Sequence, residues 1–176
     1  GYAEVMATCP IVPLYITNLN TPADNYWIIG GTAAIHVYKE STDDWSDITR
    51  SSGIYHATAE ENWTSTVLGG VLVMTNGFDD PQFWALDSTG EPDVATVMAD
   101  LTAWPNDLEC YSMRAFRSFL VALNVTDSSG ADDERFTRKV KWSTEAATQV
   151  VPANWDETDA TIDAGEYELA DTRGGI

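Results

Sequence analysis

Short runs of β-branched and aromatic residues recur along the chain, and Gly, Asn, Asp, Pro or Ser residues separate them. Because apolar residues rarely repeat at helical spacing, the pattern predicts an all-β protein. Three strong strands are expected to begin at Trp27, Val71 and Phe119, which lie 44 and 48 residues apart. Blades of β-propellers occupy about 40 to 50 residues each. The sequence therefore predicts about three antiparallel, propeller-like blades that form a partial propeller.

The predicted blades divide one all-β domain that covers residues 1–176. Their approximate limits are 11–62, 63–110 and 111–160, and an extended C-terminal segment follows at 161–176. The last residues have the composition of a turn that leads into a further strand. We therefore expect the chain to be a fragment of a longer protein.

Glycines and tryptophans mark the expected turns and anchors of the blades. The predicted turn glycines are Gly30, Gly31, Gly69, Gly70 and Gly77, which stand between apolar runs as in β-hairpins. In each unit an apolar strand precedes a strand that carries Trp45, Trp84 or Trp142. Each blade is therefore expected to bury one indole near its outer strands. A β-sandwich with the same tryptophans in its core is the alternative architecture.

One segment, residues 93–101, is predicted to be a short helix. It lacks Gly and Pro, and its apolar residues follow the i, i+3, i+4, i+7 spacing of one helix face. Pro105 comes shortly afterwards, as is common beyond the end of a helix. The helix is expected to fill the connection between the second and third blades.

The chain is strongly acidic, with 28 acidic and 9 basic residues and a formal net charge of -19. This charge repels nucleic-acid phosphates and anionic membranes, so neither is an expected partner. No apolar run approaches the roughly 20 residues that span a bilayer. The densest acidic clusters, Asp79-Asp80 and Asp132-Asp133-Glu134, do not follow the spacing of a calcium loop. We interpret them as solvated loop carboxylates, and no metal or cofactor is predicted.

The side chains needed for nucleophilic catalysis are scarce. His36 and His56 are the only histidines, and the sequence contains no G-x-S-x-G elbow and no phosphate-binding glycine loop. Cys9 and Cys110 fit no zinc-binding spacing, so we expect buried thiols, and a disulfide between them stays open. A pair of hydrolytic carboxylates is harder to exclude because the fold sets their separation. No catalytic residue is predicted, and the protein is not expected to be an enzyme.

Several short motifs occur in the same order as in a known protein family. They include Asn25-Tyr26-Trp27-Ile28, Leu68-Gly69-Gly70, Pro81-Gln82-Phe83-Trp84, Val140-Lys141-Trp142-Ser143 and Pro152-Ala153-Asn154-Trp155-Asp156. Together they resemble a family of virion structural proteins of tailed bacteriophages with propeller-like repeats, in particular the nozzle proteins of short phage tails. A complete member of that family continues well beyond Ile176.

The resemblance implies a function in assembly. It implies an oligomeric tail, nozzle or head-to-tail connector protein, which belongs to the tail of the virion and is assembled in the cytoplasm of the bacterial host. The implied partners are copies of itself in a ring and other tail proteins. The resemblance also implies blade-core or loop-anchoring roles for Trp63, Pro81, Phe83, Trp142 and Trp155. With Trp27, Trp45 and Trp84, these tryptophans complete the set of predicted anchors.

Two other functions stay open. A carbohydrate-binding or glycoside-cleaving β-propeller should expose aromatic side chains in a groove, and an enzyme of this kind needs two carboxylates there. An extracellular adhesion domain is compatible with the acidic surface and with the glycosylation sequons at Asn62 and Asn124. A structural subunit, by contrast, should bury its tryptophans and place apolar surface at contacts between chains.

Overall fold

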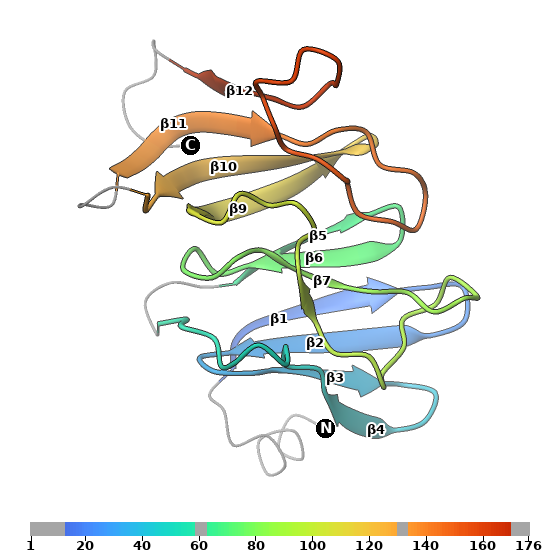
Figure 1. Cartoon of the computed structure of the whole chain (residues 1–176). Helices are drawn as coiled ribbons and strands as arrows, with labels where there is room; N and C mark the ends of the chain where they lie inside the picture. Colours follow the sequence, from blue (N-terminus) through green and yellow to red (C-terminus); the bar gives the residue numbers. More distant parts are fainter. Residues whose placement is uncertain (1–12, 59–62, 130–133, 170–176) are drawn as a thin grey trace.

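The structure, a computed structural model, describes residues 13–58, 63–129 and 134–169. These ranges form twelve β-strands in three four-stranded sheets and contain no helix (Figure 1). Sheet 1 consists of β1 (Pro13–Asn20), β2 (Asn25–Gly31), β3 (Ile35–Lys39) and β4 (Asp44–Asp47). Sheet 2 consists of β5 (Thr64–Leu68), β6 (Val71–Thr75), β7 (Gln82–Trp84) and β8 (Ala99–Asp100). Sheet 3 consists of β9 (Leu108–Phe116), β10 (Phe119–Asp127), β11 (Glu134–Trp142) and β12 (Gly165–Glu168). The prediction of an all-β protein is confirmed.

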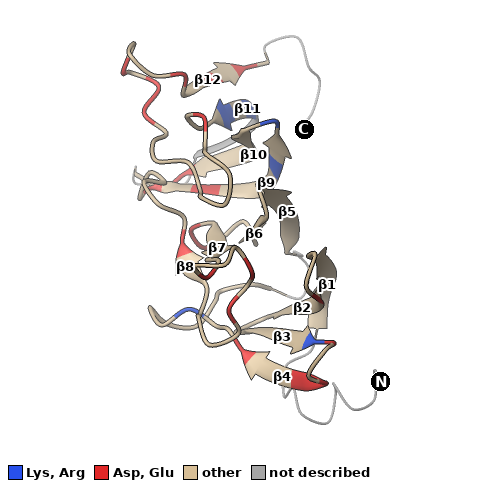
Figure 2. Ribbon diagram, turned by 90° about the vertical axis from the view of Figure 1, so that its right-hand side faces the viewer, with Lys and Arg blue, Asp and Glu red and all other residues tan. Residues whose placement is uncertain are grey.

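Each sheet is an antiparallel meander, because strands that follow one another in the chain also pair with one another. β5 contacts both β1 and β9, so the first strands of the three sheets lie next to one another. The later strands extend away from them, and β4 and β12 lie at opposite ends of the molecule (Figure 1, Figure 2). This arrangement is compatible with neighbouring propeller blades, which radiate around a central channel.

Two apolar cores separate the three sheets. The first core, between sheets 1 and 2, includes Ile28 and Val37 from sheet 1. The second core, between sheets 2 and 3, includes Leu120 from sheet 3. Strand β6 serves both cores, since Leu72 belongs to the first and Val73 to the second, and all five residues of β6 are buried. Sheet 2 is therefore covered on both faces, which explains its continuous apolar sequence.

The prediction of a helix at 93–101 is wrong. Asp93 instead closes a turn, in which its carboxylate accepts a hydrogen bond from the Thr96 hydroxyl (3.0 Å). Asp side chains compete in this way with helical backbone hydrogen bonds. The chain then enters β8. Met98 packs in the first core and Leu101 in the second, whereas Val97 is exposed. Helix-like spacing here reflects a segment that crosses between cores.

Gly30 sets the distance between sheets 1 and 2. Gly30 and Gly31 were predicted to form a turn, but they are the last residues of β2. The chain reverses just after them, over residues 32–34. A Cβ atom on Gly30 would lie 2.6 Å from Cδ1 of Trp63, whose indole N–H donates to the Gly31 carbonyl (2.9 Å). The absence of a side chain therefore allows an indole to pack directly on the strand.

The other predicted turn glycines do occupy turns. Gly69 and Gly70 join β5 to β6 with φ angles of 56° and 97°, and Gly77 follows β6 with a φ of 83°. Glycine adopts these left-handed conformations without the steric cost that a Cβ atom brings.

We expect Gly30→Ala to lower the free energy of unfolding by about 1 to 3 kcal/mol, because the added methyl group overpacks the indole of Trp63. Urea denaturation monitored by circular dichroism measures this loss. Trp63→Ala removes the Cγ, Cδ1 and Nε1 atoms that the methyl group meets, so the double variant should lose less than the sum of the single losses. Strict additivity would contradict the direct contact.

Candidate assembly surfaces

A charged cluster around Asp79 joins sheets 1 and 2. Asp79 lies in the loop after β6, and its side chain is 4% exposed. Its carboxylate accepts hydrogen bonds from the Arg50 guanidinium (2.7 Å), the backbone N–H of His56 (2.8 Å) and the Asn76 amide (2.8 Å). Arg50 also forms an ion pair with Asp100 on β8 (3.3 Å). Asp79 is therefore a buried structural tie, and its interpretation as a solvated loop carboxylate is wrong.

Two adjacent carboxylates in this cluster have opposite pKa shifts. Burial raises the pKa of Asp79, but the hydrogen bonds from His56 and Asn76 and the charge of Arg50 outweigh burial, so its pKa lies below the usual value. The pKa of Asp80 is raised, first by burial and then by the charge of Asp100. Both carboxylates are partly desolvated, but only Asp79 has enough hydrogen bonds and positive charge beside it to offset the effect of burial on its pKa.

The face of sheet 1 that points away from sheet 2 carries the aromatic column, formed by Trp27, Tyr38 and Trp45. These residues pair across β2, β3 and β4, and the Tyr38 and Trp45 rings lie 5.0 Å apart. Trp27 is 42% exposed. The Trp27 indole donates to Glu40 (2.7 Å), and the Tyr38 hydroxyl donates to Asp43 (2.7 Å). The surface is thus aromatic at its centre and acidic at its rim.

Sheet 3 has an uncovered apolar surface on the side away from sheet 2. This surface, the open face, is formed by Phe116, Phe119, Val121, Val140 and Trp142. With Asp163 at one edge, they line a cavity of about 470 Å³. Phe116 is 62% exposed, whereas Leu120 and Ala122 are fully buried on the other side of β10. Since successive residues of a strand point to opposite faces, β10 is apolar on both faces but covered on only one among the described residues.

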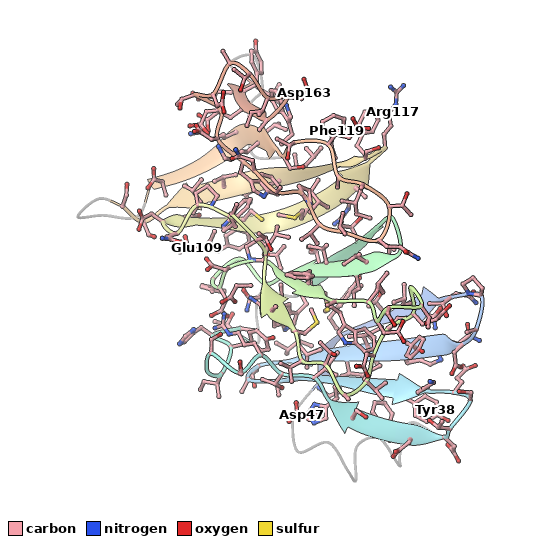
Figure 3. The ribbon with its side chains drawn as sticks, turned by 45° about the vertical axis from the view of Figure 1, so that its right-hand side comes forward. Tyr38, Asp47, Glu109, Arg117, Phe119 and Asp163 are labelled. Carbon is pink, nitrogen blue, oxygen red and sulfur yellow. The ribbon has the colours of Figure 1, made fainter. Side chains whose placement is uncertain are left out.

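Basic residues flank the open face. Arg114 pairs with Val121 in the β9–β10 register and therefore lies on the same face. The guanidinium carbon of Arg117 lies 5.6 Å from the centre of the Phe116 ring. Figure 3 shows Arg117 and Phe119 together at one end of sheet 3, close to Asp163. Six of the nine basic residues lie in the segment 114–141, and Lys and Arg gather on the strands of sheet 3 in Figure 2. Lys141 does not belong to the open face, because it is buried and pairs with Ala122, a residue of the second core.

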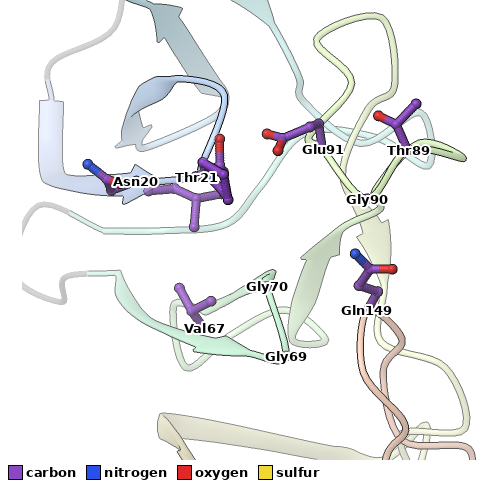
Figure 4. A pocket seen from close by; sticks show the side chains of 11 residues that line it. Asn20, Thr21, Val67, Gly69, Gly70, Thr89, Gly90, Glu91 and Gln149 are labelled. Carbon is purple, nitrogen blue, oxygen red and sulfur yellow. The ribbon is translucent and has the colours of Figure 1, made fainter.

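A second cavity, of about 290 Å³, lies where loops of the three sheets meet. Its walls include Asn20, Thr21, the Gly69-Gly70 turn and Gln149 (Figure 4). Glu91 is the only carboxylate among the described residues that line it, and its buried Oε2 has no hydrogen-bond partner there. Glycoside hydrolysis by a carboxylate pair needs two such groups about 5 to 9.5 Å apart. Among the described residues, this cavity has one carboxylate and so does not provide such a pair.

The predicted tryptophan anchors fall into two groups. Three are at most 1% exposed and belong to the cores: Trp63, Trp84 and Trp155. The other three lie on the outer faces: Trp27, Trp45 and Trp142. Trp104, which is not among the predicted anchors, is 5% exposed and packs edge-on against Trp155 at a ring distance of 4.8 Å. The available signal was the Trp104-Pro105 pair just before the long strand β9.

The remaining chemical candidates do not gather into a site among the described residues. Cys110 is a free, fully buried thiol, and burial raises its pKa to about 12. Cys9 and the cluster residues Asp132 and Asp133 lie outside the described residues. His36 lies on β3, opposite Asp47. Within the described ranges no three His, Cys, Asp or Glu side chains gather closely enough to hold a metal ion.

A scan against models of protein families finds no match, and a search of the curated proteins finds none either. In the part of the chain that the structure describes, no helix is long and apolar enough to cross a membrane. The surfaces of the protein are therefore the main guide to its function.

We expect Asp79→Asn to lower the free energy of unfolding by about 3 kcal/mol near pH 7, because Arg50 loses its most buried partner. The native pKa of Asp79 lies below its unfolded value, so its contribution is present above about pH 4 and is lost as the pH falls through the native pKa. The difference between wild type and variant should therefore shrink in acid. Urea denaturation at several pH values measures it.

The neighbouring substitution Asp80→Asn is the matched control. Because the native pKa of Asp80 is raised, its charge opposes folding above its unfolded pKa. The variant should be as stable as wild type or more stable at pH 7. A loss equal to that of Asp79→Asn would contradict the assignment of the two roles.

Proposed function

We propose that this protein is a structural component of a bacteriophage virion, an oligomeric tail, nozzle or connector subunit that acts by assembly with other chains. The observation that carries the proposal is the open face of sheet 3. The ordered motifs that resemble tail nozzle proteins give the assembly its proposed setting, with copies of the chain and other tail proteins as partners.

The open face supports assembly because it is a contiguous apolar patch rather than a scatter of single residues. Isolated exposed apolar side chains are normal on soluble proteins, but clustered ones mark contacts with other molecules. Strand β10 has the two-sided apolar pattern of the fully buried strand β6, which lies between two sheets. The sequence of β10 therefore suits a strand that packs against other protein on both of its faces.

The acidic surface is consistent with a component past which DNA moves. A net charge of -19 repels phosphate groups, so a wall of such subunits does not retain the nucleic acid. This support requires carboxylates that face the path of the DNA, because charges more than about 8 Å away are screened at physiological salt.

Gold-labelled antibodies against the protein should mark one end of the tail on particles of the encoding phage in electron micrographs.

In the same phage, Phe116→Ser should reduce the yield of complete tails, because it removes a side chain from the open face. Since Phe116 is 62% exposed, the melting temperature of the isolated variant should change little. Ile54→Ser is the matched control, as Ile54 is 66% exposed and lies elsewhere.

If the antibodies label no phage particle and all of the protein is found free in the lysate, the proposal is overturned. An equal effect of the Phe116 and Ile54 substitutions on tail yield would remove the role of the open face.

Carbohydrate binding is the second candidate, and the aromatic column is the observation that favours it. Flat aromatic rings with neighbouring carboxylates can stack on sugar rings and accept hydrogen bonds from their hydroxyl groups. Glu40 and Asp43 already accept hydrogen bonds from the Trp27 indole and the Tyr38 hydroxyl, which fixes the column but occupies part of its polar rim.

If the column binds glycans, titration with bacterial surface oligosaccharides should shift the tryptophan fluorescence of the wild type. Trp27→Ala should abolish binding, whereas Phe116→Ser, at the other end of the molecule, should not affect it. No fluorescence change with any oligosaccharide at millimolar concentration would exclude this function for the column.

A further inference from the structure

The three sheets repeat one packing relation. One face of sheet 1 packs on sheet 2, and the opposite face of sheet 2 packs on sheet 3. Among the described residues, the relation leaves two surfaces without a covering sheet, which are the aromatic column on sheet 1 and the open face on sheet 3. A third contact of the same kind would place the open face against the aromatic column.

These two surfaces cannot meet within one molecule. β4 and β12 mark opposite ends of the structure, with sheet 2 between them (Figure 1). Figure 3 shows the same separation for Tyr38 on sheet 1 and Phe119 on sheet 3. The contact therefore requires the aromatic column of a different molecule.

The charges of the two surfaces are complementary. Glu40 and Asp43 border the aromatic column, and the exposed Asp47 at the end of β4 lies on the same face, two residues after Trp45. Figure 2 shows acidic residues on β4. Arg114 and Arg117 flank the open face. Opposite charges on the rims of facing apolar surfaces favour one orientation of the contact.

We propose that the open face of sheet 3 docks on the aromatic column of sheet 1 of a second copy of this chain. Each copy carries both surfaces, so the contact is heterologous and can close into a ring or continue as a filament. In this proposal it closes after two copies, with two identical contacts and a ring of six sheets. Propellers commonly contain about four to eight blades, a range that includes two copies of three sheets but excludes three copies. This inference deepens the proposed function, because it names the partner of the open face.

Sedimentation equilibrium of the purified 176-residue chain tests the inference. We expect a dimer of about twice 19.3 kDa at micromolar concentration. Reversing the basic rim with Arg114→Glu and Arg117→Glu should weaken dimerisation at least tenfold. Reversing the acidic rim with Glu40→Lys and Asp47→Lys should have the same effect. Combining all four substitutions in one chain should restore the dimer, because the rims are again complementary.

The matched control reverses two exposed acidic residues that belong to neither surface, Asp107→Lys and Glu145→Lys, and should leave the dimer intact. Circular dichroism melting shows whether each variant is folded. A monomer at about 100 µM, a dimer insensitive to both rim reversals, or a four-fold variant that stays monomeric although folded would each overturn the inference. A monomer whose aromatic column binds an oligosaccharide would overturn it in favour of the glycan.

The outcomes separate this inference from the proposed function. A monomeric chain that still appears on phage tails in gold labelling leaves the virion role intact and assigns the open face to another tail protein. A dimer that is absent from the particle supports the contact and overturns the virion role.

Discussion

The structure depends on one constraint, which is that a sheet with two apolar faces must be covered twice. Sheet 2 meets this constraint inside the molecule, and the five buried residues of β6 are the result. Covering both faces of a sheet removes far more apolar area from water than covering one. Sheet 3 has a similar two-sided sequence in β10 but only one covering sheet among the described residues. The second apolar face of sheet 3 therefore favours contact with a partner molecule, for the same reason that sheet 2 is buried between two sheets.

The relative position of the sheets is set by a few contacts that tolerate little change. The Trp63 indole lies directly on Gly30, and Asp79 holds Arg50 at the same junction. Between sheets 2 and 3, the Thr75 hydroxyl donates to the Cys110 carbonyl (2.7 Å). Buried polar groups of this kind must find partners, so they specify one arrangement more strictly than apolar packing does. Because the sheets are fixed in this way, the aromatic column and the open face keep a defined geometry.

The sequence predicts local features of the fold well and long-range ones poorly. The apolar strand at Val71–Thr75 is recognisable because both of its faces are buried, and its preceding turn follows from Gly69-Gly70. The helix at 93–101 is mispredicted because Asp93 caps a turn and the apolar residues after it enter two different cores. The buried state of Asp79 depends on Arg50, a residue 29 positions away, and no local pattern encodes that pairing. For the same reason the sequence indicates a strong strand at Phe119 but does not reveal which face of it stays open.

The distribution of charge explains why two such acidic molecules can associate in one orientation. Net charges of -19 repel at long range, but at physiological salt this repulsion is screened beyond about 8 Å. Contacts within a few ångströms are screened less, so the local pattern decides the outcome. Two open faces brought together oppose arginines to arginines, and two aromatic columns oppose carboxylates to carboxylates. The contact between unlike surfaces brings the arginines of one copy to the carboxylates of the other, and this favours it over pairing between two identical faces.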